Sequence, residues 1–216
     1  MITTPELVDL LAKSARPVRR LASPRTRSAT WLSFAAAVLT VIVLYHGLRS
    51  DIAERTGESL FLVQVGASLM TAVTAAYAAF CLSLPDRSPL WALAPVPTLA
   101  LWISVIGYGC LNGWVSLPSS GLPRSEVFQC LGTIALTSAP LLLLFAIMLR
   151  PSRAAKPTSA SLMGALSVAS FAATGVSLIH NIEASMMVIM LNVGTVALML
   201  ALSGMFGQRV VSGIRP

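Results

Sequence analysis

The sequence predicts an all-α integral membrane protein, a bundle of six transmembrane helices with both termini in the cytoplasm. Three observations support this prediction. Hydrophobic residues make up 56% of the 216 residues and charged residues only 11%, whereas soluble domains carry about 25% charged residues. Six apolar runs follow one another, each long enough to cross a hydrocarbon core about 30 Å thick. Lysine and arginine gather in segments that would share one side of the membrane.

Residues 1–28 form a polar and basic leader ahead of the first apolar run. Thr3 and Glu6 have the spacing of a capping box, and Pro17 ends the helix that this box would start. Three leucines recur within it at helical spacing: Leu7, Leu10 and Leu11. An amphipathic helix of this kind fits either the membrane surface or the groove of a partner protein.

The six apolar runs cover residues 29–47, 60–84, 91–110, 127–149, 159–178 and 185–206. Pro95 and Pro97 stand near the start of the third run and Pro140 within the fourth, which predicts a kink in both helices because proline lacks an amide hydrogen. The whole chain divides accordingly into a cytosolic leader, a membrane domain and a cytosolic tail, at residues 1–28, 29–206 and 207–216.

The distribution of basic residues predicts the orientation of this domain. With a cytoplasmic N-terminus, twelve of the fifteen lysines and arginines lie inside, and three lie outside, namely Arg49, Arg55 and Arg124. The opposite orientation would reverse this bias, so we expect an inner-membrane protein with both ends inside. Retention of basic residues in the cytoplasm also accounts for the net charge of +7. No direct binding of nucleic acid is therefore expected.

The apolar runs contain no charged residue or histidine at depth. Transporters and proton pumps need such groups to bind or relay charge, and intramembrane enzymes need polar catalytic groups. The sequence also lacks a phosphate-binding glycine loop and an HExxH metalloprotease motif. These absences argue against an enzyme, and we expect no cofactor.

Two cysteines, Cys110 and Cys130, are the best candidates for chemistry. The segment 91–150 has the pattern of a membrane-spanning hairpin, and the two thiols stand at the loop-facing ends of its helices. If these helices are neighbours, both thiols lie at the outer face, where a disulfide can persist. Closing the loop would stabilise the hairpin by ~3 kcal/mol. The pattern fits a disulfide that acts as a redox switch, a permanent disulfide that only stabilises the hairpin, or two buried free thiols. Cys81, near the inner side, is interpreted as a packing residue.

A metal site at the outer face is a weaker candidate. His180 and Glu183 lie in the last outer loop, on the same side as the two outer cysteines. Imidazole and thiolate suit zinc or a softer ion. The sequence has no close ligand pair such as CxxC or HxxxH, so no metal is expected.

Several stretches together resemble the NrsF family. They are Leu7–Leu11 followed by Pro17-Val18-Arg19-Arg20-Leu21, Trp31-Leu32, Gly47-Leu48-Arg49, Ala78-Ala79-Phe80, Trp91-Ala92-Leu93-Ala94-Pro95-Val96-Pro97 and Gly107-Tyr108-Gly109-Cys110. Cys130 resembles the cysteine that opens the fourth helix of that family. Members are six-helix inner-membrane anti-sigma factors that hold an extracytoplasmic-function sigma factor and release it under oxidative or heavy-metal stress.

The resemblance implies roles for particular residues. The region that would hold the sigma factor contains Leu7, Leu10, Leu11, Arg19 and Arg20, and Cys130 matches a sensing cysteine. Many members carry a His-Cys pair in the last outer loop, where this chain has His180-Asn181. The usual second thiol is therefore absent. Either Cys110 replaces it, or sensing works differently, or this member no longer senses redox state.

A function of another class fits the same composition. A small membrane subunit of a larger complex, or a solute carrier, would also show six apolar runs and a basic inner side. The scarcity of charge at depth argues against the carrier. The leader separates the two readings, because only an anti-sigma factor needs the apolar face of that helix to hold its partner.

Overall fold

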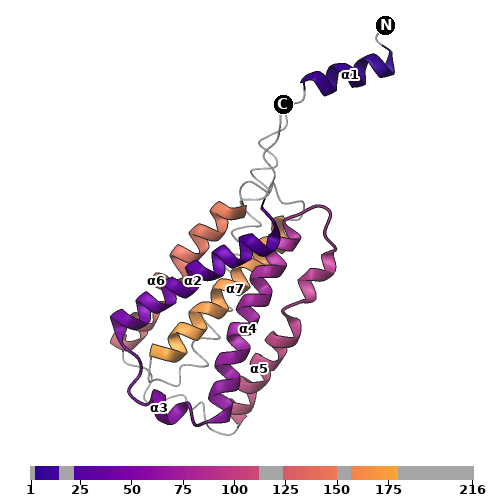
Figure 1. Ribbon diagram of the computed structural model, residues 1–216. Helices are drawn as coiled ribbons and strands as arrows, with labels where there is room; N and C mark the ends of the chain where they lie inside the picture. The colour runs from indigo at the N-terminus through magenta and orange to yellow at the C-terminus, as the bar shows by residue number, and fades with distance from the viewer. Residues whose placement is uncertain (1–2, 15–21, 112–123, 150–156, 180–216) are drawn as a thin grey trace.

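The computed structural model describes residues 3–14, 22–111, 124–149 and 157–179, and their regular structure is entirely helical (Figure 1). The α-helices are α1 (Thr4–Ser14), α2 (Pro24–His46), α3 (Ile52–Arg55), α4 (Ser59–Leu82), α5 (Val96–Leu111), α6 (Arg124–Leu149) and α7 (Pro157–Ile179), with a 3-10 helix η1 at Pro89–Leu93. Within these residues five segments have the length and apolar character of a membrane span: Pro24–His46, Ser59–Leu82, Pro89–Gly109, Gly132–Leu149 and Thr158–Ile179. The sixth expected span, 185–206, lies outside the described residues.

Helices α4 and α7 form the centre of the bundle. Their contact is built from small side chains, including Ala72 on α4 and Ala172 on α7, which are almost fully buried. The Ser167 hydroxyl donates to the Ala72 carbonyl at 2.6 Å, and the hydroxyls of Ser68 and Thr174 lie 2.9 Å apart. Small residues let two helix backbones approach, and hydroxyls bond across the contact where no water is present. The fifth apolar run, residues 159–178, is rich in alanine, serine and glycine, and these small residues allow the close packing of α7 on α4.

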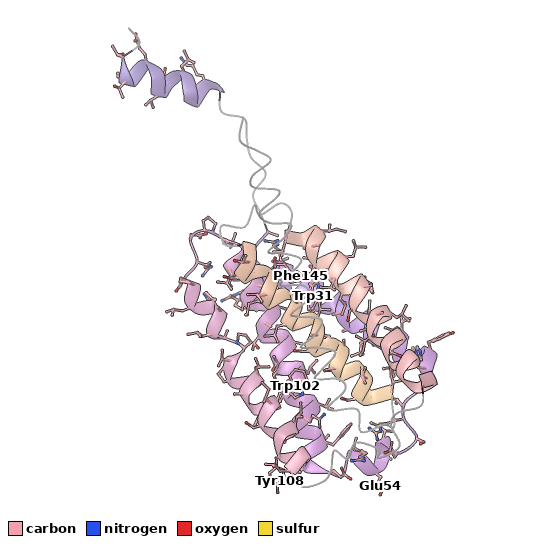
Figure 2. All side chains as sticks on the ribbon, turned by 180° about the vertical axis from the view of Figure 1, so that it is seen from behind. Trp31, Glu54, Trp102, Tyr108 and Phe145 are labelled. Carbon is pink, nitrogen blue, oxygen red and sulfur yellow. The ribbon has the colours of Figure 1, made fainter. Side chains whose placement is uncertain are left out.

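The remaining spans flank this central pair. Helix α5 packs against α4, whereas α6 packs against α7 and α2. In both views α5 and α6 lie on opposite sides of the α4–α7 pair (Figures 1 and 2). The two helices of the expected hairpin over 91–150 are therefore not packed side by side. Twelve intervening residues, 112–123, separate them in the chain, and so long a connection does not require the helices that it joins to be neighbours.

Two helix boundaries differ from the expectation. Helix α2 begins at Pro24, five residues before the first apolar run, because the Ser23 hydroxyl accepts from the Thr26 amide at 3.2 Å and caps the helix. The third run is not one kinked helix. Its start is η1, and α5 begins only after Pro95, since two prolines remove amide donors that a continuous helix would need.

Candidate functional site

Helix α1 is an amphipathic segment that lies apart from the bundle (Figure 1). The Glu6 carboxylate accepts from both the amide and the hydroxyl of Thr3 at 2.9 Å, which confirms the expected contact between these two residues at the helix start. These hydrogen bonds lower the pKa of Glu6. Leu10 is 59% exposed and Val8, at the edge of the apolar side, is 61% exposed, so the described part of this side of the helix is uncovered.

The other leader candidates are placed only in part. Leu7 and Leu11 lie in α1 at positions that share a helix face with Leu10, but their side chains lie outside the described part of the structure. Arg19 and Arg20 fall between the described residues 3–14 and 22–111. Their expected role in partner binding stays a prediction.

Arg27 joins three helices at the end of the bundle where α2 begins. Its guanidinium donates to the Met148 carbonyl at the end of α6 and, at 3.3 Å, to the Ser83 hydroxyl that follows α4. It also lies over the Phe80 ring, 4.9 Å from the ring centroid. The side chain is only 6% exposed, and all of its described partners are neutral. In the sequence, Arg27 is only one of the twelve basic residues expected on the cytoplasmic side.

An aromatic cluster lies directly beneath Arg27. Trp31, one helical turn further along α2, is fully buried, and its indole donates to the Leu141 carbonyl of α6 at 3.3 Å. The ring centroid of Trp31 is 5.7 Å from that of Phe145, edge to face, and Figure 2 shows the two residues together. Gly164 of α7 leaves the space for Phe145, because a Cβ atom there would come within 2.2 Å of the ring.

Arg27 and Trp31 were missed as functional candidates although the sequence carries a signal for them. Ser23-Pro24 is a helix start, and it places both residues on one face of α2, in line with Ala35. All three are buried. An arginine one helical turn before a tryptophan, on the same face of a helix, indicates that the arginine packs inside the bundle.

The opposite end of the bundle carries an ion-pair cluster around α3. Asp51 accepts from Arg49 through both carboxylate oxygens, at 2.5 and 2.7 Å, and from Arg55 at 3.5 Å. Arg55 also reaches Glu58 at 3.2 Å. The hydrogen bonds from Arg49 lower the pKa of Asp51 to about 2. Arg49 itself is 8% exposed and its amide donates to the Leu178 carbonyl, so the cluster is fixed to the end of α7.

The two candidate thiols lie at this same end. Cys110 is in the last turn of α5 and Cys130 in the second turn of α6, and both helix ends lie towards α3 (Figure 1). Their side chains lie outside the described part of the structure, so a bond between them stays a prediction. The backbone placement adds a condition. Because α4 and α7 separate the two helices, a disulfide requires the ends of α5 and α6 beside α3 to approach. Cys81 is a free, buried thiol, as expected of a packing residue.

The two candidate metal ligands, His180 and Glu183, lie outside the described residues. Among the residues that are described, no three histidine, cysteine, aspartate or glutamate side chains gather into a set that could hold a metal ion. An open pocket of about 530 Å³ lies between α4 and α5 near the α3 end, lined by Leu60, Ser104, Val105 and Tyr108. It is lined mainly by apolar surface and brings no further candidate ligand to this end.

The chain matches the model of a protein family over nearly its whole length. The model of a family described as NrsF, negative regulator of sigma F, matches residues 11–212 of the 216. No curated protein and no solved structure matches the chain. The matched residues begin inside α1, so Leu11, Arg19 and Arg20 fall within them, whereas Leu7 and Leu10 precede them.

Proposed function

Since this chain belongs to the NrsF family, negative regulators of sigma F, we propose that it is a membrane-bound anti-sigma factor. It holds an extracytoplasmic-function sigma factor at the inner membrane through its cytosolic leader, and it releases this partner on an oxidative or heavy-metal signal at the outer face. The observation that carries the proposal is the family match over nearly the whole chain. The task is sequestration of a partner, which requires no catalysis.

The charges at the two ends of the bundle support the proposed orientation. The end where α2 begins and α4 ends carries Arg25, Arg27 and Arg87 against one described carboxylate, Asp86. At the α3 end, Arg49 and Arg55 face three described carboxylates: Asp51, Glu54 and Glu58. An excess of basic residues marks the cytoplasmic side of a membrane protein. We therefore assign the α2 start, and with it the leader, to the cytoplasm.

The exposed apolar face of α1 supports the leader as the docking element. A partner's groove buries such a face by taking up apolar side chains at helical spacing, and Val8 and Leu10 are uncovered. The lipid surface competes for the same face. Leu10 also precedes the residues that the family model matches, so its role rests on its exposure and its place in the helix.

Release requires the outer end to favour a second arrangement of the bundle. Reversing a 99:1 population takes about 5.5 kcal/mol of differential binding, whereas one disulfide that closes a loop of this size contributes ~3 kcal/mol. Oxidation of Cys110 and Cys130 alone would therefore shift the population only in part. Contacts of the leader, or a bound soft metal ion, would have to supply the rest.

A pull-down with matched leader variants tests the proposal. The full-length protein is purified in detergent from its native host, and bound proteins are identified by mass spectrometry. The test variant changes Leu7, Leu10 and Leu11 to glutamine. The control variant is Lys13→Gln, which breaks the exposed Lys13–Asp9 ion pair on the polar face of the same helix. We expect a sigma factor with the wild type and the control, and its loss from the test variant. Absence of a sigma factor from the wild type would refute the function.

A further inference from the structure

We propose that Arg27 is a positioning residue that connects α6 to the leader, so that a change at the outer end of α6 alters how the leader is presented. This inference extends the proposed function and rests on it. Arg27 lies in the first turn of α2, at the end of the leader (residues 1–28), and its guanidinium bonds to the Met148 carbonyl of α6. The place where the leader leaves the bundle is thus fixed against the inner end of α6.

Helix α6 has the right extent to carry such a change. It begins at Arg124 at the outer end, contains Cys130 in its second turn and ends at Leu149 beside Arg27. At 1.5 Å per residue its 26 residues span about 39 Å, more than the ~30 Å depth of the hydrocarbon core. One continuous helix therefore joins the candidate sensing cysteine to the acceptor of the arginine.

The side-chain contacts between α2 and α6 that the structure describes include several near the leader. Besides the bond from Arg27, the Trp31 indole donates to Leu141, and its ring packs edge to face on Phe145. All of these α6 partners follow Pro140, whose missing amide leaves the Leu136 carbonyl without its usual donor. The segment of α6 after Pro140 is thus held to α2 as a unit, and any displacement of that segment reaches the first turn of α2.

The chemistry of the Arg27 contacts suits a connection that can be released. Met148 is among the last four residues of α6, whose carbonyls have no donor within the helix, and Ser83 offers a hydroxyl. Both acceptors are neutral. If Arg27 leaves them, no opposite charge loses its partner, whereas release of Arg49 at the other end would take from Asp51 one of its two arginine partners. Release of Arg27 would therefore break no ion pair among the described residues.

The test measures release of the sigma factor from the full-length protein in detergent. The complex is treated with diamide, which oxidises thiols, or with cadmium ions, and the partner that stays bound is quantified. Arg27→Met is compared with Arg25→Met, which removes the same charge from an exposed site two residues away. Cys130→Ser shows whether the signal enters through α6. Heating each variant and recording its monodisperse fraction separates a coupling effect from loss of the fold.

We expect Arg25→Met to bind and release like the wild type. Arg27→Met is expected to bind the sigma factor at rest. The signal-induced drop in its affinity for the sigma factor is expected to be smaller than in the wild type by a factor of roughly 5 to 150, the ordinary range of coupling between two sites. If Arg27→Met does not fold, Arg27→Lys replaces it. Lysine keeps the charge but cannot serve both acceptors through a planar fork, so a reduced response is again expected.

Three outcomes overturn the inference. They are a wild-type response in the folded Arg27 variant, loss of binding at rest in that variant, and a wild-type complex that neither probe releases. Each of these requires that the wild type binds a sigma factor. Failure of the wild type to bind one would instead refute the proposed function, so the two failures are distinguishable.

Discussion

Arg27 and Arg49 are buried arginines at opposite ends of the bundle, and they are held in different ways. Each lies over a phenylalanine ring, with the guanidinium carbon 4.9 Å from the Phe80 centroid and 5.9 Å from the Phe61 centroid. Arg49 pairs with the Asp51 carboxylate, whereas the described partners of Arg27 are a carbonyl, a hydroxyl and a ring. The end that we assign to the cytoplasm therefore keeps its positive charge, and the other end neutralises it. The two ends also differ in what stabilises them, namely packing beneath Arg27 and ion pairs around Arg49.

Removal of the Trp31 ring tests this difference most strongly. Trp31→Ala is expected to lower the free energy of unfolding by roughly 3–5 kcal/mol, because it leaves a cavity among tightly packed rings. The measurement is the temperature at which the detergent-solubilised protein loses its monodisperse peak. Tyr45→Ala, on the same helix but at an 82% exposed site, is the control. Equal losses in the two variants would contradict a packed leader-side core.

Gly164→Ala tests the same core by overpacking. The added Cβ atom would lie 2.2 Å from the Phe145 ring, so the ring has to shift, and we expect a loss of about 1–3 kcal/mol. The control is Gly66→Ala on α4, where an added Cβ meets nothing within 4 Å. Thermal unfolding in detergent should separate the two variants. An unchanged Gly164→Ala protein would show that the space beside Phe145 is larger than described.

Asp51→Asn tests the α3 end and should have a smaller and more local effect. An amide accepts fewer hydrogen bonds from Arg49 and carries no charge to balance it. We expect faster hydrogen–deuterium exchange over residues 48–59 and unchanged exchange over 24–31. Glu54→Gln, at an exposed site in the same short helix, should leave both segments as they are. Faster exchange at the leader end would show that the two ends are stabilised together.

Lowering the pH has the smallest expected effect of these tests near neutral pH. At low pH it should distinguish the α3 end from the leader end most sharply. The pKa of Asp51 in the folded protein is about 2, below its ordinary value of 3.8, so the unfolded loop binds the proton more readily. Its stabilising effect is complete above pH 3.8 and is lost as the pH falls through about 2. Exchange over residues 48–59, corrected for its intrinsic pH dependence, should rise only in that window. A rise between pH 5 and 7 would assign the change to another group.

Local signals in the sequence predicted much of the secondary structure. The apolar runs gave the five described spans, and Thr3 with Glu6 gave the start of α1. Helix α2 begins before the first apolar run because the Ser23-Pro24 cap, and not hydrophobicity, sets where this helix starts. The third run breaks at Pro95, since two prolines so close to a helix start end one helix and begin another.

Long-range packing could not be predicted in the same way. Lipid tails are as apolar as the side chains of these runs, so every face of such a helix can contact lipid. Hydropathy therefore does not indicate which helices are neighbours. The separation of α5 and α6 by α4 and α7 therefore came from the structure alone. The partners of Arg27 lie 56 and 121 residues away, beyond any spacing rule. The helix ends that contain Cys110 and Cys130 lie at one end of the bundle, and both the role of these residues and the bond between them stay predictions.

The contact between α4 and α7 determines how late in synthesis the helix bundle can be completed. Ser167 meets Ala72 across 95 residues of chain, and Thr174 meets Ser68 across 106. At the usual 5–20 residues per second, a ribosome needs roughly 5 to 20 s to make that interval. Until then the hydroxyl of Ser68 faces lipid or the insertion machinery without its final partner. Nascent chains that stop before α7 are accordingly expected to be substrates for membrane quality control.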